Sequence, residues 1–206
     1  MASTKPEAAV NRRRQILDAA IRVFARQGFH ACRVSDIARE AGVAYGLVYH
    51  YFESKEEVLN ELFSERWSVL LAAIEEVDAR PIPPRAKLDA VAGFIIDSYR
   101  HDPELMKVIV VEVTRAANSF GRTHLPEIRQ AYELIAKIVS DAQQAGEFRR
   151  DVDPMYASMW FYGAIEQLLS AWVFELLPAG DGEFDNAREM VVETICGGLE
   201  RGAGGR

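Results

Sequence analysis

Apolar residues recur at helical spacing along most of this 206-residue chain, and no segment alternates apolar and polar residues as a half-buried strand would. The first short stripe follows i, i+3, i+4 and i+7 and consists of Val34, Ile37, Ala38 and Ala41. A longer stripe precedes it and consists of Ile16, Ala20, Val23 and Phe24, with Gly28 as its stop. The pattern predicts one long and one short helix that share a core.

A third helix is predicted at about 45–51, after a sharp turn at Gly42. The buried pattern restarts there with Val43, Val48 and Phe52. Ser54 and Glu57 then form a capping box, in which the hydroxyl accepts an N–H of the next helix and the carboxylate reaches back. Three helices with a glycine turn between the last two predict a helix-turn-helix module.

The remainder of the chain is also predicted to be helical, with proline and glycine as punctuation. A helix over 55–79 stops before the proline-rich segment 81–84. Further helices are predicted at about 85–100, 103–117, 125–145, 153–177 and 184–200. The sequence therefore predicts an all-α fold of about nine helices, with a helix-turn-helix DNA-binding domain over 1–54 and a helical ligand-binding and dimerisation domain over 55–206.

The 45–51 helix has few buried positions for its length. Its predicted outward side chains are Tyr45, Leu47, Tyr49, His50 and Tyr51. Gly46 offers no side chain, so a phosphate could approach the backbone closely there. Phenol and imidazole groups can donate to phosphate oxygens, and Leu47 can contact a thymine methyl. Packing against the rest of the chain is the alternative for Tyr49, but it does not account for all five positions.

Residues 11–62 resemble the N-terminal domain of TetR-family transcriptional repressors. The shared features are DIA–x–x–AGV at 36–43, G–x–x–Y–x–YF at 46–52 and the lysine before the acidic turn. The resemblance covers about a quarter of the chain and implies that the module binds an operator in double-stranded DNA. The DNA-contacting residues that it implies are Arg33, Ser35, Tyr45, Gly46, Leu47, Tyr49, His50, Tyr51 and Lys55.

Two positions depart from the family pattern. Arg33 replaces the usual threonine that caps the second helix, and Ala44 replaces the usual serine that opens the third. Each change removes a side-chain acceptor that is typically worth about 1 kcal/mol. Arg33 could instead aim at a phosphate, so the operator sequence of a relative cannot be transferred to this chain.

Basic charge is concentrated where the motif lies. Residues 1–55 carry nine Lys/Arg against five Asp/Glu, although the whole chain has a net charge of −7. An acidic protein that keeps its positive charge at one end is compatible with DNA binding. Arg12, Arg13 and Arg14 are expected just before the first helix, as an arm that reaches a phosphate or the minor groove. A solvated basic tail is the alternative.

Length and composition restrict the class of protein. With 49% hydrophobic residues the chain can bury a substantial core. Asp18 interrupts the early apolar run, and no uncharged stretch reaches the roughly 18 residues of a membrane span, so we expect a cytoplasmic protein without a membrane segment. Cys32 and Cys196 fall in different predicted domains, without CxxC or histidine neighbours, so no disulfide, metal or cofactor is expected.

The 153–177 helix is apolar around its whole circumference, which requires burial on every side. One face can pack inward, and the opposite face then needs a second subunit. We therefore expect a homodimer in which this helix and the last one form a four-helix bundle with their copies. The predicted interface residues are Phe161, Leu168, Trp172, Met190, Ile195 and Leu199. A central core helix in a monomer is the alternative.

The middle helices combine apolar residues with scattered polar ones, which is compatible with an effector cavity and equally with a filled core. The candidate ligand-binding residues are Tyr99, Met106, Ile109, Glu112, Val113, Phe120, Met159, Tyr162 and Glu166. Glu166 stands among apolar neighbours on its helix. It must be paired, protonated or turned toward a polar ligand, because an unpaired buried charge is costly.

A second resemblance concerns this part of the chain. GEFRRDVD at 146–153, followed by Gly163, Glu166 and Trp172, is similar to the TetR-type repressors of fatty-acid degradation, in which a long-chain acyl-CoA enters the C-terminal domain and releases DNA. The resemblance implies that an acyl tail would lie among Ile109, Val113, Met159 and Tyr162. The cations that could meet the phosphates of the CoA part are Arg100, Lys107, Arg115, Arg122 and His124.

Other classes of protein are less well supported by the sequence. An all-helical enzyme would need a catalytic constellation, but there is no Glu-x-x-His pair and no Gly-x-Ser-x-Gly pattern, and the four histidines are isolated from one another. A protein-interaction scaffold, or a regulator with a different apolar effector, remains the alternative to an acyl-CoA-responsive repressor.

Overall fold

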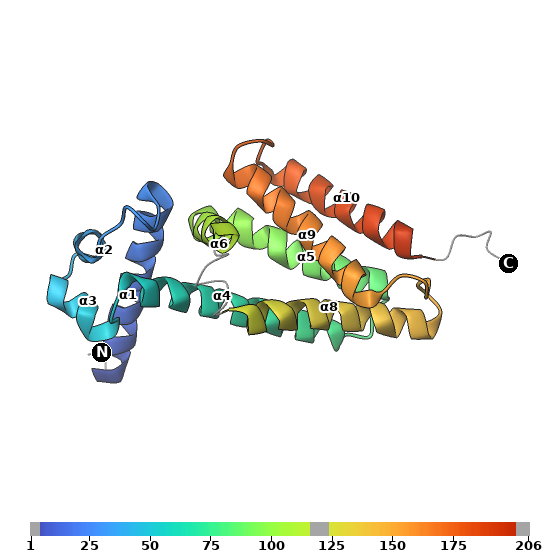
Figure 1. The fold of residues 1–206 in the computed structure, drawn as a ribbon, viewed down its shortest axis with the longest axis horizontal. Helices are drawn as coiled ribbons and strands as arrows, with labels where there is room; N and C mark the ends of the chain where they lie inside the picture. The colour runs from blue at the N-terminus through green and yellow to red at the C-terminus, as the bar shows by residue number, and fades with distance from the viewer. Residues whose placement is uncertain (1–4, 116–123, 201–206) are drawn as a thin grey trace.

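Across residues 5–115 and 124–200, which the structure describes, the computed structural model contains nine helices and no strand (Figure 1). The first three are α1 (Lys5–Gln27), α2 (Val34–Glu40) and α3 (Tyr45–Tyr51). The others are α4 (Lys55–Asp78), α5 (Pro84–His101), α6 (Pro103–Arg115), α8 (Leu125–Ala145), α9 (Pro154–Val173) and α10 (Asp181–Leu199). The predicted all-α fold is confirmed.

Helices α1–α3 and the start of α4 form a compact unit that we call the head, seen at the left of Figure 1. Its core is built from the predicted stripes, and Ile16, Val23 and Ile37 are almost fully inaccessible to solvent. Gly28 has a φ of 79°, in the left-handed region that favours glycine, and it ends α1 as expected.

The remaining helices form a larger unit that we call the body. Its core lies between α4, α5, α8 and α9, with α10 packed on α5 and α9. In this body α9 is shorter than predicted. It ends at Val173 because Glu175 adopts a φ of 57°, which no α-helix accommodates, and the apolar run that suggested a helix to 177 continues as a loop.

Helix α4 connects the two units without a break. Ser54 Oγ accepts the backbone N–H of Glu57 at 3.1 Å, as the capping box predicts, and the Glu57 carboxylate accepts the N–H of Glu53, one residue before the cap. The first turns of α4 contribute Val58, Leu59 and Leu62 to the head core. Its later turns contribute Phe63, Trp67, Leu70, Ile74 and Val77 to the body core.

Helix α6 forms a second connection between head and body. It packs against α1 of the head, beside which it lies in Figure 1, and against α9 of the body. Val108 of α6 belongs to the head core, whereas Met106 and Ile109 belong to the body core. The helix therefore inserts one face into each unit.

Candidate functional site

The turn between α2 and α3 presents α3 on the outside of the head. Gly42 adopts a φ of 65°, and the N–H of Val43 reaches the carbonyl of Ala38 at 3.0 Å. This left-handed turn directs the chain into α3, which is held to the core by the buried Val48. The rest of α3 is left for the outer surface.

Three aromatic side chains of α3 face solvent. Tyr45 is 54% exposed and Tyr49 is 46% exposed, and His50 is also exposed. The Tyr45 hydroxyl lies 3.2 Å from that of Tyr49, and this hydrogen bond raises the pKa of Tyr49. The Tyr49 phenol therefore stays protonated at neutral pH, and the hydroxyls of both residues can donate to phosphate oxygens.

Two predicted α3 contacts are less accessible than expected. Leu47 and Tyr51 are half-buried, and Tyr51 packs against the head core. The expectation that all five side chains point outward is wrong for these two, because a seven-residue helix of two turns must seal its own underside. Contact between DNA and the exposed part of each remains a prediction.

The starts of α2 and α3 lack side-chain caps, as the sequence predicted. Arg33 is exposed at the first of these positions, and its backbone N–H donates to Asp36 Oδ2 at 3.0 Å. Ala44 opens α3 without a side-chain acceptor. Ser35 and Gly46 are exposed on the same part of the head, so Arg33, Ser35 and Gly46 stay candidates for DNA contact.

The basic run is not an arm. Arg12, Arg13 and Arg14 lie inside α1, because the preceding residues already form its first turns. Arg13 pairs with Glu61 at 2.6 Å and lies over the ring of Phe52, 5.0 Å from its centroid. This pairing raises the pKa of Arg13 and lowers that of Glu61. Arg12 stays exposed and is better placed than Arg13 to contact a phosphate.

Lys55 has an internal role that the sequence did not reveal. Its Nζ donates to the carbonyl oxygens of Phe29, His30 and Cys32 at 2.9, 3.3 and 3.0 Å, and it lies 4.5 Å from the centroid of the Phe29 ring. The ammonium group therefore ties the start of α4 to the loop after α1. All three N–H donors of the ammonium group are used within the head. They are therefore not free for the contact with DNA that the resemblance implied.

We expect Lys55→Met to destabilise the protein by about 2 kcal/mol, because three carbonyl oxygens lose a charged donor. Chemical denaturation would measure this as a lower midpoint. The exposed Lys107→Met is the control and should leave the midpoint unchanged. Equal stability of Lys55→Met and the wild type would mean that the three bonds contribute nothing.

In the body, several predicted effector residues converge on a small, partly open void of about 40 Å³ between α4, α5, α6 and α9. Met106 and Ile109 reach it from α6, and Tyr162 and Glu166 from α9. The other residues around it are Arg66, Trp67, Leu70, Ile95, Val110 and Leu169. Arg66 and Trp67 were not predicted as effector residues, although an arginine beside a buried tryptophan of α4 is a signal that the sequence contains.

The polar groups around this void are held in uncharged or poorly solvated surroundings. Burial lowers the pKa of Arg66, whose guanidinium donates to Ser98 Oγ and lies 5.2 Å from the centroid of the Phe94 ring. Burial raises the pKa of both Tyr162 and Glu166. Within the described residues no ion pair reaches Glu166, and burial is the cause of the shift in its pKa.

Glu166 makes the stability of the protein depend on pH. The pKa of Glu166 in the folded state lies above the unfolded value of about 4.3. Its contribution to the free energy of unfolding is therefore fully present below about pH 4.3, and it is lost as the pH rises through the folded-state pKa. Between pH 5 and pH 8 we expect the melting temperature of wild type to fall relative to that of Glu166→Gln. The fall should be about 2–4 °C for each kcal/mol of lost unfolding free energy.

Thermal melts across this range would measure the difference. The exposed Glu189→Gln is the control, and its melting curve should follow wild type at every pH. Parallel curves for wild type and Glu166→Gln would contradict a raised pKa of the Glu166 carboxyl in the folded protein.

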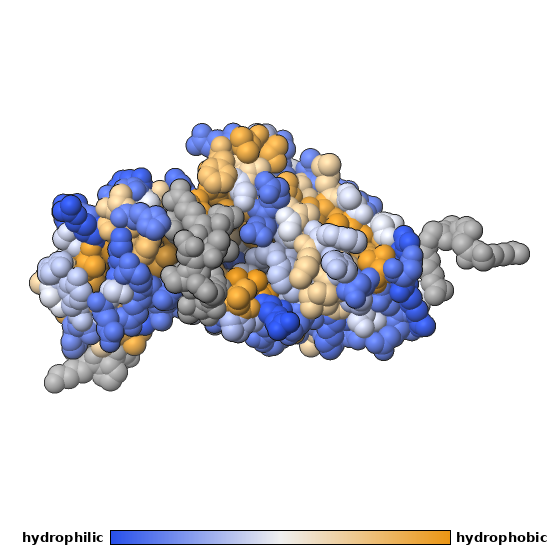
Figure 2. Space-filling model, viewed as in Figure 1, coloured by the Kyte–Doolittle hydropathy of each residue, from blue (hydrophilic) through white to orange (hydrophobic). Residues whose placement is uncertain are grey.

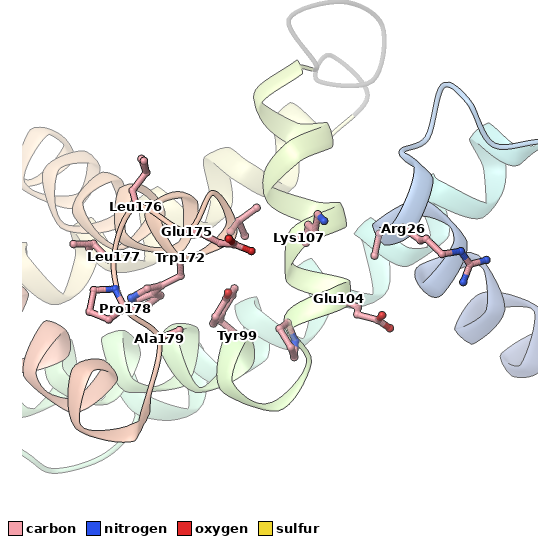
Figure 3. Close-up of a pocket in the computed structure, with 13 residues that line it drawn as sticks. Arg26, Tyr99, Glu104, Lys107, Trp172, Glu175, Leu176, Leu177, Pro178 and Ala179 are labelled. Atoms are coloured by element: carbon pink, nitrogen blue, oxygen red, sulfur yellow. The ribbon is translucent and has the colours of Figure 1, made fainter.

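A separate groove of about 930 Å³ lies where the head meets the body. Figure 3 shows Arg26 on one side and Tyr99, Lys107 and the loop after α9 on the others. Tyr99 packs on Trp172 with ring centroids 5.6 Å apart, so it lies at this groove and not at the void to which it was assigned.

Other effector candidates lie elsewhere. Met159 is exposed on the outer face of α9, so its assignment to an internal cavity is wrong. Glu112, Val113 and Arg115 belong to the end of α6, and their side chains, together with all of Phe120 and Arg122, lie outside the described residues.

Two candidate cations are not available at the surface. Arg100 pairs with Asp97, Asp181 and Asp185 at 3.3, 3.2 and 3.0 Å. His124 is buried against the Phe63 ring, and burial lowers its pKa, so it is neutral at pH 7. Lys107 alone among the described candidates is exposed and lines the groove.

The predicted dimer residues divide into two groups. Phe161 and Leu199 are buried within the subunit, so their assignment to an interface is wrong; they belong to the inner face of their helices. Trp172 is also buried, but it borders the groove between α9 and α10, so its place at an interface stays a prediction. Leu168 and Ile195 are half-buried and Met190 is 60% exposed. These three line an apolar groove of about 570 Å³ between α9 and α10.

The face around this groove carries further exposed apolar residues. Tyr156 and Trp160 stack on each other on the outer side of α9, next to Met159. The loop that follows α9 exposes Phe174, Leu176 and Leu177, and apolar side chains form the prominent patch at the top of Figure 2. An apolar face of this extent on a small protein marks an interaction surface.

A three-helix head with an exposed α3, joined to a helical body with an inner void, defines the class of helix-turn-helix transcriptional regulators. Residues 16–62 match the family described as bacterial regulatory proteins of the tetR family, and residues 84–171 match the tetracyclin repressor-like C-terminal domain. The fatty acid metabolism regulator protein of Bacillus subtilis is 32% identical over 188 residues, which are 90% of this chain and 94% of that relative. The chain belongs to the TetR family of transcriptional regulators.

Further comparisons agree with this assignment. The repressor KstR2 of Rhodococcus jostii is 27% identical over 91% of each chain. A crystal structure of FadR from Bacillus subtilis in complex with stearoyl-CoA has a TM-score of 0.80 at 26% identity and covers 90% of this chain and 98% of that one. FadR from Bacillus halodurans shares the fold with a TM-score of 0.82, at 24% identity and over 98% and 100% of the two chains. These relatives are regulators and not enzymes.

In the described part of the chain, none of the helices combines the length and the apolar character that crossing a bilayer demands. Cys32 and Cys196 are both buried and unbridged.

Proposed function

We propose that this chain is a repressor that binds an inverted-repeat operator as a homodimer and is released from it by a long-chain acyl-CoA. The observation that carries the proposal is the likeness to the Bacillus subtilis fatty acid metabolism regulator over nearly the whole of both chains. The stearoyl-CoA complex of a structural relative at 26% identity supports the effector class.

The head supplies the DNA-binding surface in this proposal. Tyr45, Tyr49 and His50 give α3 a row of donors for phosphates, and the bare backbone at Gly46 permits close approach. A two-fold dimer presents two such helices to half-sites about 34–36 Å apart, or a multiple of that distance. The α9–α10 face, with Leu168, Met190 and Ile195 at its centre, is the proposed dimer interface.

The effector acts in the body in this proposal. It enters the region of the void, which must widen to hold an acyl chain, and it must bind one arrangement of the heads more tightly than the other. Two helices can transmit that preference: α4, which is continuous with the head, and α6, which places Val108 in the head core and Met106 at the void. A coupling of about 1–3 kcal/mol is enough.

Fluorescence anisotropy with a duplex from the DNA upstream of the protein's own coding region tests the proposal. If about 6–10 phosphates are contacted, affinity should fall 10³–10⁵-fold between 50 and 200 mM salt. Stearoyl-CoA should release the bound duplex, whereas CoA alone should not. Salt-independent binding would contradict a phosphate-contacting head, and persistence of the complex with stearoyl-CoA would contradict the effector.

A different apolar effector is the second candidate. The likeness to the repressor KstR2 of Rhodococcus jostii favours it. KstR2 of Mycobacterium tuberculosis is described as a ketosteroid transcriptional regulator. Release of the operator by a ketosteroid and not by stearoyl-CoA would select this alternative.

A further inference from the structure

One buried hydrogen-bond donor in the body lacks a partner. Trp67 is 5% exposed, and within the described residues its Nε1–H meets no acceptor. Buried polar groups are paired in the great majority of cases, and leaving one unpaired costs about 1–3 kcal/mol. The indole N–H belongs to a side chain that lines the small void between α4, α5, α6 and α9.

The groups around Trp67 are also mostly donors. Tyr162 stacks on the Trp67 ring with centroids 6.0 Å apart, and its phenol is protonated because burial raises its pKa. Arg66, the residue before Trp67 on α4, gives one donor to Ser98 and has four more. Glu166 is a further donor when protonated. The lining of the void therefore includes several side chains that carry N–H or O–H donors.

The rest of the lining is apolar and consists of Leu70, Ile95, Met106, Ile109, Val110 and Leu169. A volume of about 40 Å³ holds one small group and not a chain of many carbons. An acceptor oxygen attached to an apolar chain suits this combination, because the oxygen satisfies the donors and the first methylene groups meet the apolar walls.

The geometry points to this void as the site that binds the acyl oxygen of the effector, with Trp67 Nε1–H and the Tyr162 hydroxyl as donors. In an acyl-CoA that oxygen is the thioester carbonyl; in a free fatty acid it is a carboxylate oxygen. This inference rests on the proposed function, since it names the part of the effector that the body recognises. Arg66 and Trp67 lie on α4, so recognition of the oxygen acts on the helix that continues into the head.

Three probes separate the possibilities by calorimetric titration of the full-length protein: stearoyl-CoA, its thioether analogue S-octadecyl-CoA, which has a CH₂ in place of the carbonyl, and sodium stearate. We expect wild type to bind stearoyl-CoA about tenfold more tightly than the thioether, the value of one or two neutral hydrogen bonds. Trp67→Phe removes the N–H and keeps an aromatic ring, and it should bring the ratio close to one.

Matched controls and a second variant guard against a change in folding. Trp172→Phe alters a buried tryptophan that does not line the void and should keep the tenfold ratio. Tyr162→Phe should reduce the ratio in the same direction as Trp67→Phe, whereas Tyr132→Phe, whose ring packs on Tyr162, should not. Melting curves show whether each variant is folded.

The outcomes distinguish this inference from the proposed function. Equal affinity of wild type for the two CoA compounds, with the operator still released, overturns the inference and leaves the acyl-CoA repressor intact. Binding of stearate alone, weakened by Trp67→Phe, supports the oxygen site and overturns the acyl-CoA effector. Binding of none of the three probes overturns both.

Discussion

Gly46→Val should lower operator affinity at least 100-fold, a loss of about 2.7 kcal/mol, without loss of folding or effector binding. A Cβ added at Gly46 meets no atom within 4 Å, so the new side chain points into open space. Valine is no worse than glycine in a helix, so α3 is not weakened. The branched side chain instead occupies the space between the α3 backbone and a phosphate, on the side where Tyr45 and Tyr49 are exposed.

Anisotropy titrations with the operator duplex would measure this loss. Gly182→Val is the matched control: it is a glycine in a helix of the body, and its added Cβ also meets nothing within 4 Å. It should bind the operator as wild type does. Unchanged affinity for Gly46→Val would show that this face of α3 does not approach DNA.

The second large effect concerns the proposed subunit interface. Met190→Glu should convert a dimer to a monomer at micromolar concentration and, because both half-sites are then bound independently, lower operator affinity at least 100-fold. Met190 stands at the apolar groove between α9 and α10 together with Leu168 and Ile195. A two-fold axis brings two copies of the substituted position into the interface, so two carboxylates would be desolvated there.

Light scattering during size-exclusion chromatography reports the change in mass. Val69→Glu is the control, because Val69 is 53% exposed, close to the 60% of Met190, but lies on α4, away from the groove. It should leave a dimer. A wild-type monomer, or a Met190→Glu dimer, would contradict the proposed interface.

Local patterns in the sequence were sufficient to place the helices of the head and the turn between α2 and α3. The spacing that places Val48 inside also leaves Tyr45 and Tyr49 outside, and Gly42 announces the turn between their helices. These features depend on neighbours three or four residues away, which a helix brings together whatever the rest of the chain does. The absence of caps at Arg33 and Ala44 was predictable for the same reason.

Features that depend on distant partners could not be predicted in this way. Nothing near Lys55 in the sequence shows that its ammonium group reaches three carbonyl oxygens more than twenty residues earlier. Phe161 and Met190 are both apolar, and only the packing of the helices shows that the first is inside and the second outside. An apolar pattern predicts that a helix is buried, but it does not show which face of the helix meets a second subunit.

The core of the head includes one residue of the body, Val108, and this limits how heads and bodies of different relatives can be recombined. The side chain of Val108 completes the packing around α1 although it is encoded half a chain later, on a helix that also borders the void. A chimera that joins this operator-reading unit to another relative's sensor would leave a hole or a clash at that position. Transfer of operator specificity between such regulators should therefore succeed only when the face of α6 that packs against α1 is transferred together with the head.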